Sequence, residues 1–165
     1  MSLRYLPEHA EAALLALELA EKEASYLAYT QRTLFGLPID LAWVQELKNR
    51  QDLAEKIDAF VSRFARLQDH IGEKLIPRFA SLLGESPKTF LDILSYAERM
   101  EWVEGAEEFI GARKLRNLLV HEYMNNAQLF LDALQSADRA THQLIGIVSR
   151  MKQQAQSVNL PSSWI

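Results

Sequence analysis

Apolar side chains recur at three- and four-residue intervals along most of the chain, the spacing that places them on one face of an α-helix. The first such run covers about residues 8–32, and Pro7 is suited to its first turn. A second run begins after Asp40, a good N-cap residue, and continues through Leu67. Gly72 and Pro77 predict a bend or break towards its end.

The same periodicity predicts three more helices in the second half of the chain. Ser86 and Pro87 have the residue types of an N-cap and a first helical position. The predicted elements are a helix from Pro87 to about residue 97, a helix over about 105–124, a turn at Asn125 and Asn126, and a last helix over about 127–156. The inward face of that last helix is expected to carry Leu129 and Ile145 among others.

These runs predict an all-α fold, an antiparallel bundle of about five helices joined by short connections. A chain of 165 residues is long enough for one well-formed core, so we expect a single domain over residues 1–165. Two aromatic pairs at helical spacing, Tyr26 with Tyr29 and Phe60 with Phe64, are expected to be packing residues.

Composition narrows the class of protein. Hydrophobic residues at 48% and charged residues at 24% are typical of a globular domain. The chain has no cysteine, which excludes disulfides and thiolate nucleophiles. No apolar run approaches the roughly 20 residues of a membrane span, and the N-terminus lacks the pattern of a signal peptide. We therefore expect a cytoplasmic protein without membrane contact.

The net charge of −4 works against a nucleic-acid partner, because the field of the whole molecule repels phosphate. Any RNA would have to be held by a local basic patch. The best candidates are Arg113 and Lys114, directly before Arg116 on the predicted helix over 105–124. A solvated helix face without a partner is the alternative interpretation of this cluster.

Residues 116–123 carry the strongest candidate chemistry, with Arg116, Asn117, His121 and Tyr123 on about two helical turns. Histidine can act as acid and base near neutral pH, and arginine offers a planar charged fork that suits phosphate. An arginine followed by a histidine at similar spacing also occurs twice elsewhere in the chain. Asn117 and Tyr123 are therefore the residues that distinguish this segment from the other two.

Helical geometry at about 100° per residue places Arg113, Asn117 and His121 along one stripe. Arg116 stands about 140° from His121 on the same geometry, so a straight helix does not bring the two side chains together unless Arg116 wraps around it. We expect a composite site in which two copies of the helix meet across the two-fold axis of a homodimer. The alternative for His121 is a polar residue on the helix flank, hydrogen bonded to Asn117.

Other chemistries find little support in the sequence. The four histidines lie on different predicted helices, without the paired spacings of a metal site. No glycine-rich phosphate loop is present. We expect no metal and no cofactor.

The motif Arg116-x4-His121-x-Tyr123, with a polar residue after the arginine, resembles that of HEPN-domain proteins, and the chain is similar to the HepT-like toxins among them. The resemblance implies a HEPN-like helical fold with an additional N-terminal helix. It implies a homodimeric, metal-independent ribonuclease, the toxin of a toxin–antitoxin pair, with RNA as substrate and tRNA as one candidate. It also implies a minimal nucleotidyltransferase antitoxin that neutralises the toxin by AMPylation of Tyr123.

The sequence leaves two other functions open. One is a non-catalytic helical module that presents nucleotide or substrate to a nucleotidyltransferase, with Arg116 and His121 contacting phosphate. The other is a helical scaffold that pairs with itself.

Overall fold

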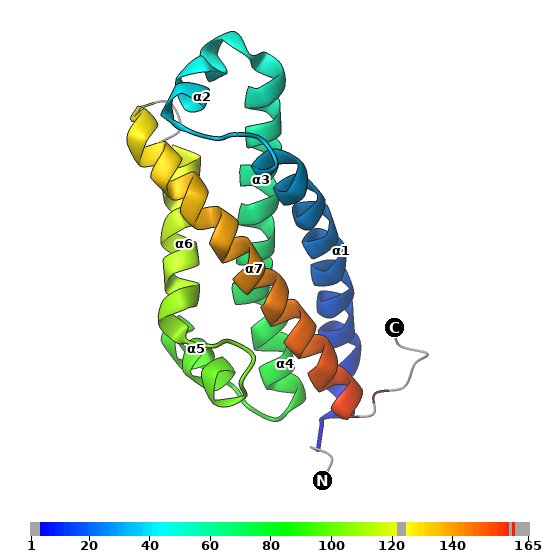
Figure 1. Cartoon of the computed structure of the whole chain (residues 1–165). Helices are drawn as coiled ribbons and strands as arrows, with labels where there is room; N and C mark the ends of the chain where they lie inside the picture. The colour runs from blue at the N-terminus through cyan, green and yellow to red at the C-terminus, as the bar shows by residue number, and fades with distance from the viewer. Residues whose placement is uncertain (1–3, 122–124, 159, 161–165) are drawn as a thin grey trace.

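The computed structural model describes residues 4–121, 125–158 and 160, with His121 described by its backbone alone. This part of the chain is helical and contains no strand, which confirms the all-α prediction. The long helices run up and down the bundle, and the last one crosses its front face diagonally (Figure 1). Their bounds are α1 Ala10–Phe35, α2 Leu41–Gln45, α3 Gln51–His70, α4 Ile76–Leu82, α5 Phe90–Arg99, α6 Ala106–His121 and α7 Ala127–Ser157.

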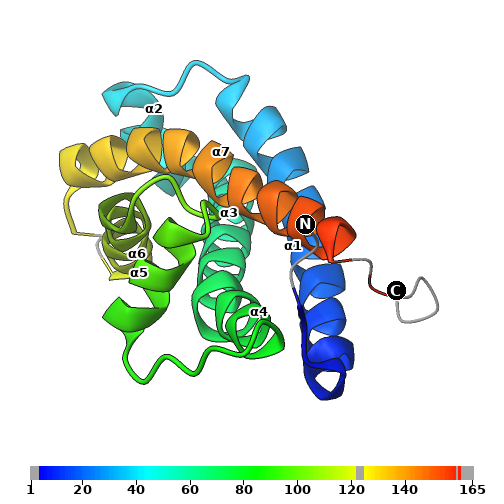
Figure 2. The ribbon, with the colours of Figure 1, turned by 90° about the horizontal axis from the view of Figure 1, so that it is seen from below.

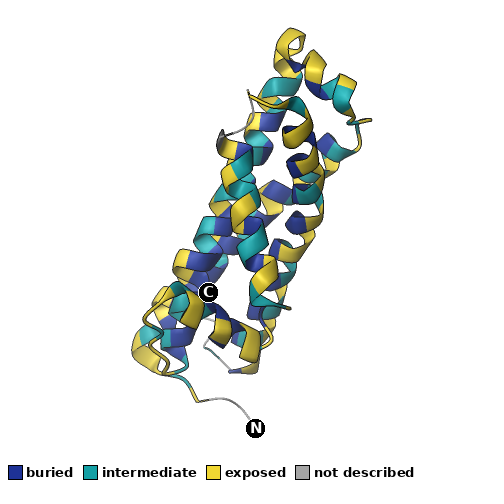
Figure 3. Cartoon of the chain, turned by 90° about the vertical axis from the view of Figure 1, so that its left-hand side faces the viewer, coloured by how far each residue is buried: buried dark blue, intermediate teal, exposed yellow. Residues whose placement is uncertain are grey.

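The core lies where α1, α3, α6 and α7 meet, and seen from below α3 occupies the middle of the bundle (Figure 2). Its apolar side chains form one cluster that includes Phe60, Phe64 and Phe130. The two α3 rings lie 6.0 Å apart, and both are fully buried, which confirms that pair as packing residues. Viewed from the side of α5 and α6, buried and exposed residues alternate along the helices (Figure 3).

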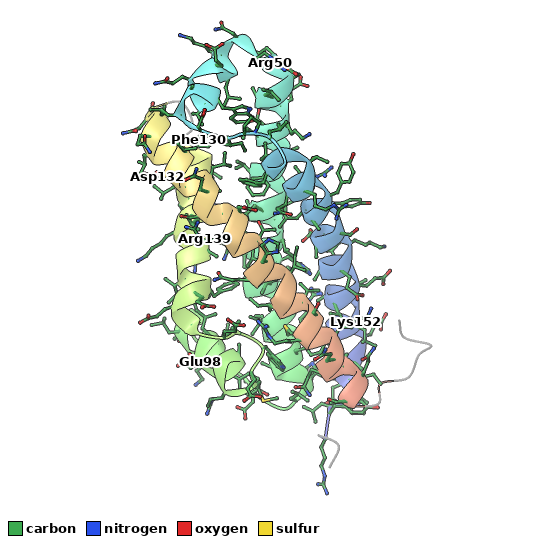
Figure 4. All side chains as sticks on the ribbon, in the orientation of Figure 1. Arg50, Glu98, Phe130, Asp132, Arg139 and Lys152 are labelled. Carbon is green, nitrogen blue, oxygen red and sulfur yellow. The ribbon has the colours of Figure 1, made fainter. Side chains whose placement is uncertain are left out.

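The first predicted helix is slightly longer than expected. A 3-10 turn, Pro7–His9, leads directly into α1, and the N–H of Leu6 donates to the carbonyl of Leu82 at 2.7 Å. Lys152 of α7 points toward α1 and pairs with Glu21 at 2.8 Å (Figure 4). These contacts fix both sides of α1 against the bundle.

The second predicted helix is interrupted. Asp40 caps α2 as expected, since its carboxylate accepts the N–H of Trp43 at 2.8 Å. A 3-10 turn, Glu46–Asn49, follows, and Arg50 then adopts a non-helical conformation before α3 begins. Arg50 pairs with Asp52 at 2.9 Å in the first turn of α3. The prediction of one continuous helix through Leu67 was therefore wrong at this point.

The expected break near Gly72 is a π-helical turn, Ile71–Leu75, that joins α3 to α4 without ending the helical path. Gly72 has a packing role here. A Cβ atom at this position would lie 3.2 Å from the ring of Phe109 on α6, closer than ordinary contact. Glycine at position 72 thus lets α6 approach α3 closely.

Two finer predictions were wrong. Helix α5 begins at Phe90, after the Ser86 and Pro87 expected to start it, because the hydroxyl of Thr89 accepts the N–H of Asp92 at 3.1 Å and acts as the cap. Leu129 is 38% exposed, because Asn126 starts α7 in a register that turns this side chain outward. Ile145 is half-buried and packs against the core, as predicted.

Tyr26 and Tyr29 were expected to be packing residues, but each is 60% exposed. Both lie on the outward side of α1, the helix at the right-hand edge of the bundle (Figure 1). The alanines and leucines on the other side of α1 supply its core contacts. The tyrosines were misassigned because the helix is apolar on two faces and the sequence alone does not say which face is buried.

Candidate functional site on α6

Helix α6 carries the predicted site, and α5 and α7 fix its start. The carboxylate of Glu98 on α5 accepts the N–H of Ala106, the first residue of α6, at 3.1 Å (Figure 4). The preceding loop is anchored to α7, because the Trp102 indole donates to Gln154 at 3.1 Å and Arg150 donates to the Trp102 carbonyl at 2.9 Å. The predicted helix over 105–124 corresponds to α6, and its expected last three residues lie outside the described residues.

The core face of α6 agrees with the helical geometry. Ala112 and Leu119 are buried, and Leu115 is half-buried. Phe109 is buried one turn before the candidate residues and contacts both Gly72 and Phe90. These contacts set how far α6 lies from α3 and α5.

Arg116 connects α6 to α3. Its Nη2 donates to the Asp69 carboxylate at 3.3 Å, and its Nη1 donates to the Asn117 side-chain oxygen at 3.0 Å. Its Nε is buried without a hydrogen-bond partner among the described residues. The side chains of Arg116 and Asp69 are 31% and 38% exposed, so the guanidinium is held in place while one edge still reaches solvent.

The contact with Asn117 changes the expected geometry. Asn117 is exposed on the stripe that also holds Arg113, and the last residue of α6, His121, is one helical turn further along this stripe. The Arg116 guanidinium therefore wraps partway around the helix toward the histidine position. The alternative contact between Asn117 and the His121 side chain lies outside the described residues, as does Tyr123.

Arg113 and Lys114 are both exposed, as a basic patch requires. Arg113 also lies over the Phe90 ring of α5, with its guanidinium carbon 4.5 Å from the ring centroid. A cation this close to an aromatic face is attracted to it and loses conformational freedom. Arg113 thus also helps to attach α5 to α6, and Lys114 is the freer of the two cations.

Asp69 was not predicted as a site residue. It lies on α3, 47 residues before Arg116, and only the packing of α3 against α6 brings the two together. Nothing in the local sequence around Asp69 signals this contact. The carboxylate gives the Arg116 guanidinium a fixed anionic neighbour, although both side chains are about one-third exposed.

A separate cavity of about 200 Å³ lies between the first half of α6 and α7. Glu104, Glu108, His142 and Arg150 line it, whereas Arg116 does not. Charges of both signs are mixed there, and Arg150 already pairs with Glu104 at 3.8 Å and with the Trp102 carbonyl. We therefore place the candidate site at Arg116 and not in this cavity.

The described residues contain neither a metal-binding cluster nor a membrane-spanning helix. No group of three or more His, Asp or Glu side chains is arranged to hold a metal ion there. No helix of the described chain has the length and apolar character needed to cross a membrane.

The comparisons with known proteins returned no relatives. The chain matches no protein-family model, and neither the curated proteins nor the solved structures contain a significant match to it.

Proposed function

We propose that the chain is a HEPN-type, metal-independent endoribonuclease, the toxin of a toxin–antitoxin pair. The observation that supports this best is the arrangement around Arg116. Asp69 and Asn117 orient its guanidinium at the surface of α6, and Asn117 lies about one helical turn before the His121 position. An oriented cation beside a histidine is what cleavage of a phosphodiester by the neighbouring ribose hydroxyl requires.

The proposed chemistry is transesterification within the RNA strand. His121 removes the proton from a ribose 2′-hydroxyl, and the 2′-oxygen then attacks the adjacent phosphorus. The bond from phosphorus to the 5′-oxygen breaks, and that oxygen takes up a proton, either from His121 or from a second His121 in a shared site. The products are a 2′,3′-cyclic phosphate and a 5′-hydroxyl.

Arg116 and Asn117 support this step without forming covalent bonds to the substrate. Negative charge builds up on the non-bridging phosphate oxygens in the transition state, and the Arg116 guanidinium stabilises that charge. Asn117 holds one edge of the guanidinium on the stripe that leads to the His121 position, since its oxygen accepts from Nη1 at 3.0 Å. Removal of one such charge-stabilising donor lowers kcat by about 10²–10³ in well-studied enzymes.

Arg113 and Lys114 would hold the RNA beside the reacting phosphate. They are exposed on the same helix as Arg116 and supply local positive charge on a chain whose net charge is −4. Such contacts neutralise phosphates and make binding depend on salt. The acidic balance of the rest of the molecule confines RNA to this surface.

The proposed partner is a minimal nucleotidyltransferase antitoxin that transfers AMP to Tyr123. AMP on Tyr123 would add negative charge and bulk two residues after His121 in the sequence and would repel RNA phosphate. Mass spectrometry after co-expression with the partner should show adenylate on the tryptic peptide 117–139. Adenylate found only on other peptides would contradict this assignment.

The proposed activity is tested by incubating the purified chain with tRNA and with total RNA, beside His121→Ala. We expect cleavage by the wild-type chain and a loss of about 10²–10⁴ in rate for the variant, the usual contribution of a general acid–base group. RNA binding without cleavage by either protein would contradict the proposal and support the non-catalytic binding module instead. Neither binding nor cleavage would support a helical scaffold.

A further inference from the structure

The outward face of α1 carries a row of large apolar side chains that no described part of the chain covers. Leu15 is 59% exposed, Leu19 45%, and Tyr26 and Tyr29 60% each. Helix α1 lies at the edge of the bundle, with α3 and α7 on its other sides (Figure 2). Two leucines and two tyrosines along one helix face exceed the scattered exposure that is normal on a protein surface.

The spacing of this row is that of a coiled coil. Leu15, Leu19, Lys22, Tyr26 and Tyr29 follow one another at steps of four, three, four and three residues, the a and d positions of a heptad repeat. Lys22 pairs with Glu18 one turn earlier at 3.3 Å, which draws its charge to the edge of the row. A single lysine at such a position favours one register over others.

The charges beside the row favour an antiparallel copy of the same helix. In this row Leu19 and Tyr26 are a positions, and Leu15, Lys22 and Tyr29 are d positions. In an antiparallel pair each a position lies against a d position of the partner, and the residues just before the a positions of the two helices face each other. When Leu19 lies opposite Lys22 and Leu15 opposite Tyr26, Glu11 lies opposite Arg32. Glu11 and Arg32 are both exposed, and neither forms an ion pair within the described part of the chain.

Other pairings fit this face less well. A parallel pair would set Glu18 against Glu23 of the second copy, two like charges, and would leave Glu11 far from Arg32. An antiparallel pair shifted by one heptad would set Arg32 opposite Glu18, which Lys22 already neutralises. Only the first register matches unpaired charges and sets Tyr26 against Leu15 and Tyr29 against Ala12.

We propose that the outward face of α1 binds the same face of a second copy of the chain in an antiparallel helix pair, with Glu11 of each copy against Arg32 of the other. The helix has 26 residues and is about 39 Å long at 1.5 Å per residue, so the contact is long enough for the roughly 800 Å² per partner of a stable interface. Arg63 already orients Tyr26, with its guanidinium carbon 5.6 Å from the ring centroid. The proposal does not rest on the ribonuclease activity.

This pairing is distinct from a contact through α6. The two helices lie on opposite sides of the bundle, α6 at the left and α1 at the right (Figure 1). A pair formed through α1 therefore leaves both copies of the Arg116 surface free. If both contacts form, the assembly is larger than a dimer, and loss of the α1 contact alone leaves a dimer.

The first test is sedimentation equilibrium of the wild-type chain and Leu15→Lys, with Leu91→Lys as the matched control. Leu91 is 63% exposed on α5, away from the proposed contact. We expect Leu15→Lys to weaken assembly at least about tenfold, because each pair buries two copies of this side chain, and Leu91→Lys to leave it unchanged. A monomeric wild-type chain, or equal assembly of all three proteins, would overturn the proposal.

A charge exchange tests the register. Glu11→Arg and Arg32→Glu should each weaken assembly, and the double variant should restore it, since the exchanged charges attract again across the interface. Losses that merely add in the double variant would overturn this register.

Cross-linking tests the direction of the pair. Because the chain has no cysteine, an introduced cysteine is the only thiol in each variant. In the proposed register the two copies of residue 22 are offset by about 4.5 Å along the axis, and the two copies of residue 15 by about 16.5 Å. A short bismaleimide should therefore link Lys22→Cys to itself and leave Leu15→Cys monomeric. Equal linking of both variants would indicate a parallel pair and overturn the proposal. RNA cleavage is measured separately, so either result leaves the proposed activity to its own test.

Discussion

Arg116 of α6 donates to Asp69 of α3 across 3.3 Å, and this contact fixes the direction of the guanidinium at the candidate site. Both side chains are about one-third exposed, and a pair of this kind contributes at most about 1 kcal/mol to folding. Its effect is therefore mainly on orientation. Asp69 holds one end of the guanidinium, and Asn117 holds the other.

Asp69→Asn should lower the rate of RNA cleavage while the thermal stability stays nearly unchanged. The amide cannot attract the guanidinium as the carboxylate does, and misorientation of a catalytic group can cost up to about 10² in rate. The control is Asp58→Asn, an exposed aspartate on the same helix. A fall in melting temperature that matches the loss of activity would assign Asp69 a purely structural role.

Gly72→Ala should destabilise the chain by about 1–3 kcal/mol, the usual cost of one extra carbon in a packed site. The added Cβ would lie 3.2 Å from the Phe109 ring and push α6 away from α3. Urea unfolding measures the loss. Gly111→Ala is the matched control, since a Cβ there meets nothing within 4 Å. If Gly72→Ala were as stable as the wild-type chain, or more stable, α6 would be able to shift away from residue 72 at no cost in folding free energy.

Glu23→Gln should stabilise the chain near neutral pH. Burial raises the pKa of Glu23, opposed by the charges of His70 and Arg66, and its Oε2 is buried without a hydrogen-bond partner among the described residues. A carboxyl whose pKa is raised in the folded chain costs stability as the pH rises through that pKa. The gain from Glu23→Gln should therefore be largest at about pH 7 and shrink toward about pH 4.

Thermal unfolding of Glu23→Gln and of the exposed Glu55→Gln at both pH values checks this effect. A less stable Glu23→Gln at neutral pH would mean that the attraction to His70 and Arg66 outweighs the cost of burial.

A shared site predicts that inactive chains complement each other. Arg116→Ala and His121→Ala, mixed so that heterodimers form, should regain activity beyond either variant alone, because one of the two sites in each heterodimer keeps both residues. No recovery in dimers verified by mass spectrometry would show instead that each chain supplies its own arginine and histidine. The contact of Arg116 with Asn117 makes that alternative geometrically accessible.

The sequence predicted most of the helices because three- and four-residue spacing is a local property. It predicted the Asp40 cap, the buried Phe60 and Phe64, and the exposed Arg113 and Asn117 on α6. It did not predict the break at Arg50, whose backbone leaves the helical conformation between the 3-10 turn and α3.

The remaining differences depend on contacts between elements. Tyr26 and Tyr29 have the spacing of core residues, and only the packing of the other α1 face shows that they point outward. Asp69 becomes part of the site only because α3 passes beside α6. Tertiary packing sets these relationships, so a local sequence pattern does not predict them.

The most direct test of the proposed activity is the chemistry of the RNA ends left by the purified chain in excess EDTA. Attack by the 2′-oxygen under control of His121 and Arg116 requires fragments that end in a 2′,3′-cyclic phosphate and begin with a 5′-hydroxyl. We expect these ends from the wild-type chain and a loss of about 10²–10⁴ in rate for His121→Ala. Fragments with 3′-hydroxyl and 5′-phosphate ends, or cleavage that EDTA abolishes, would contradict the account.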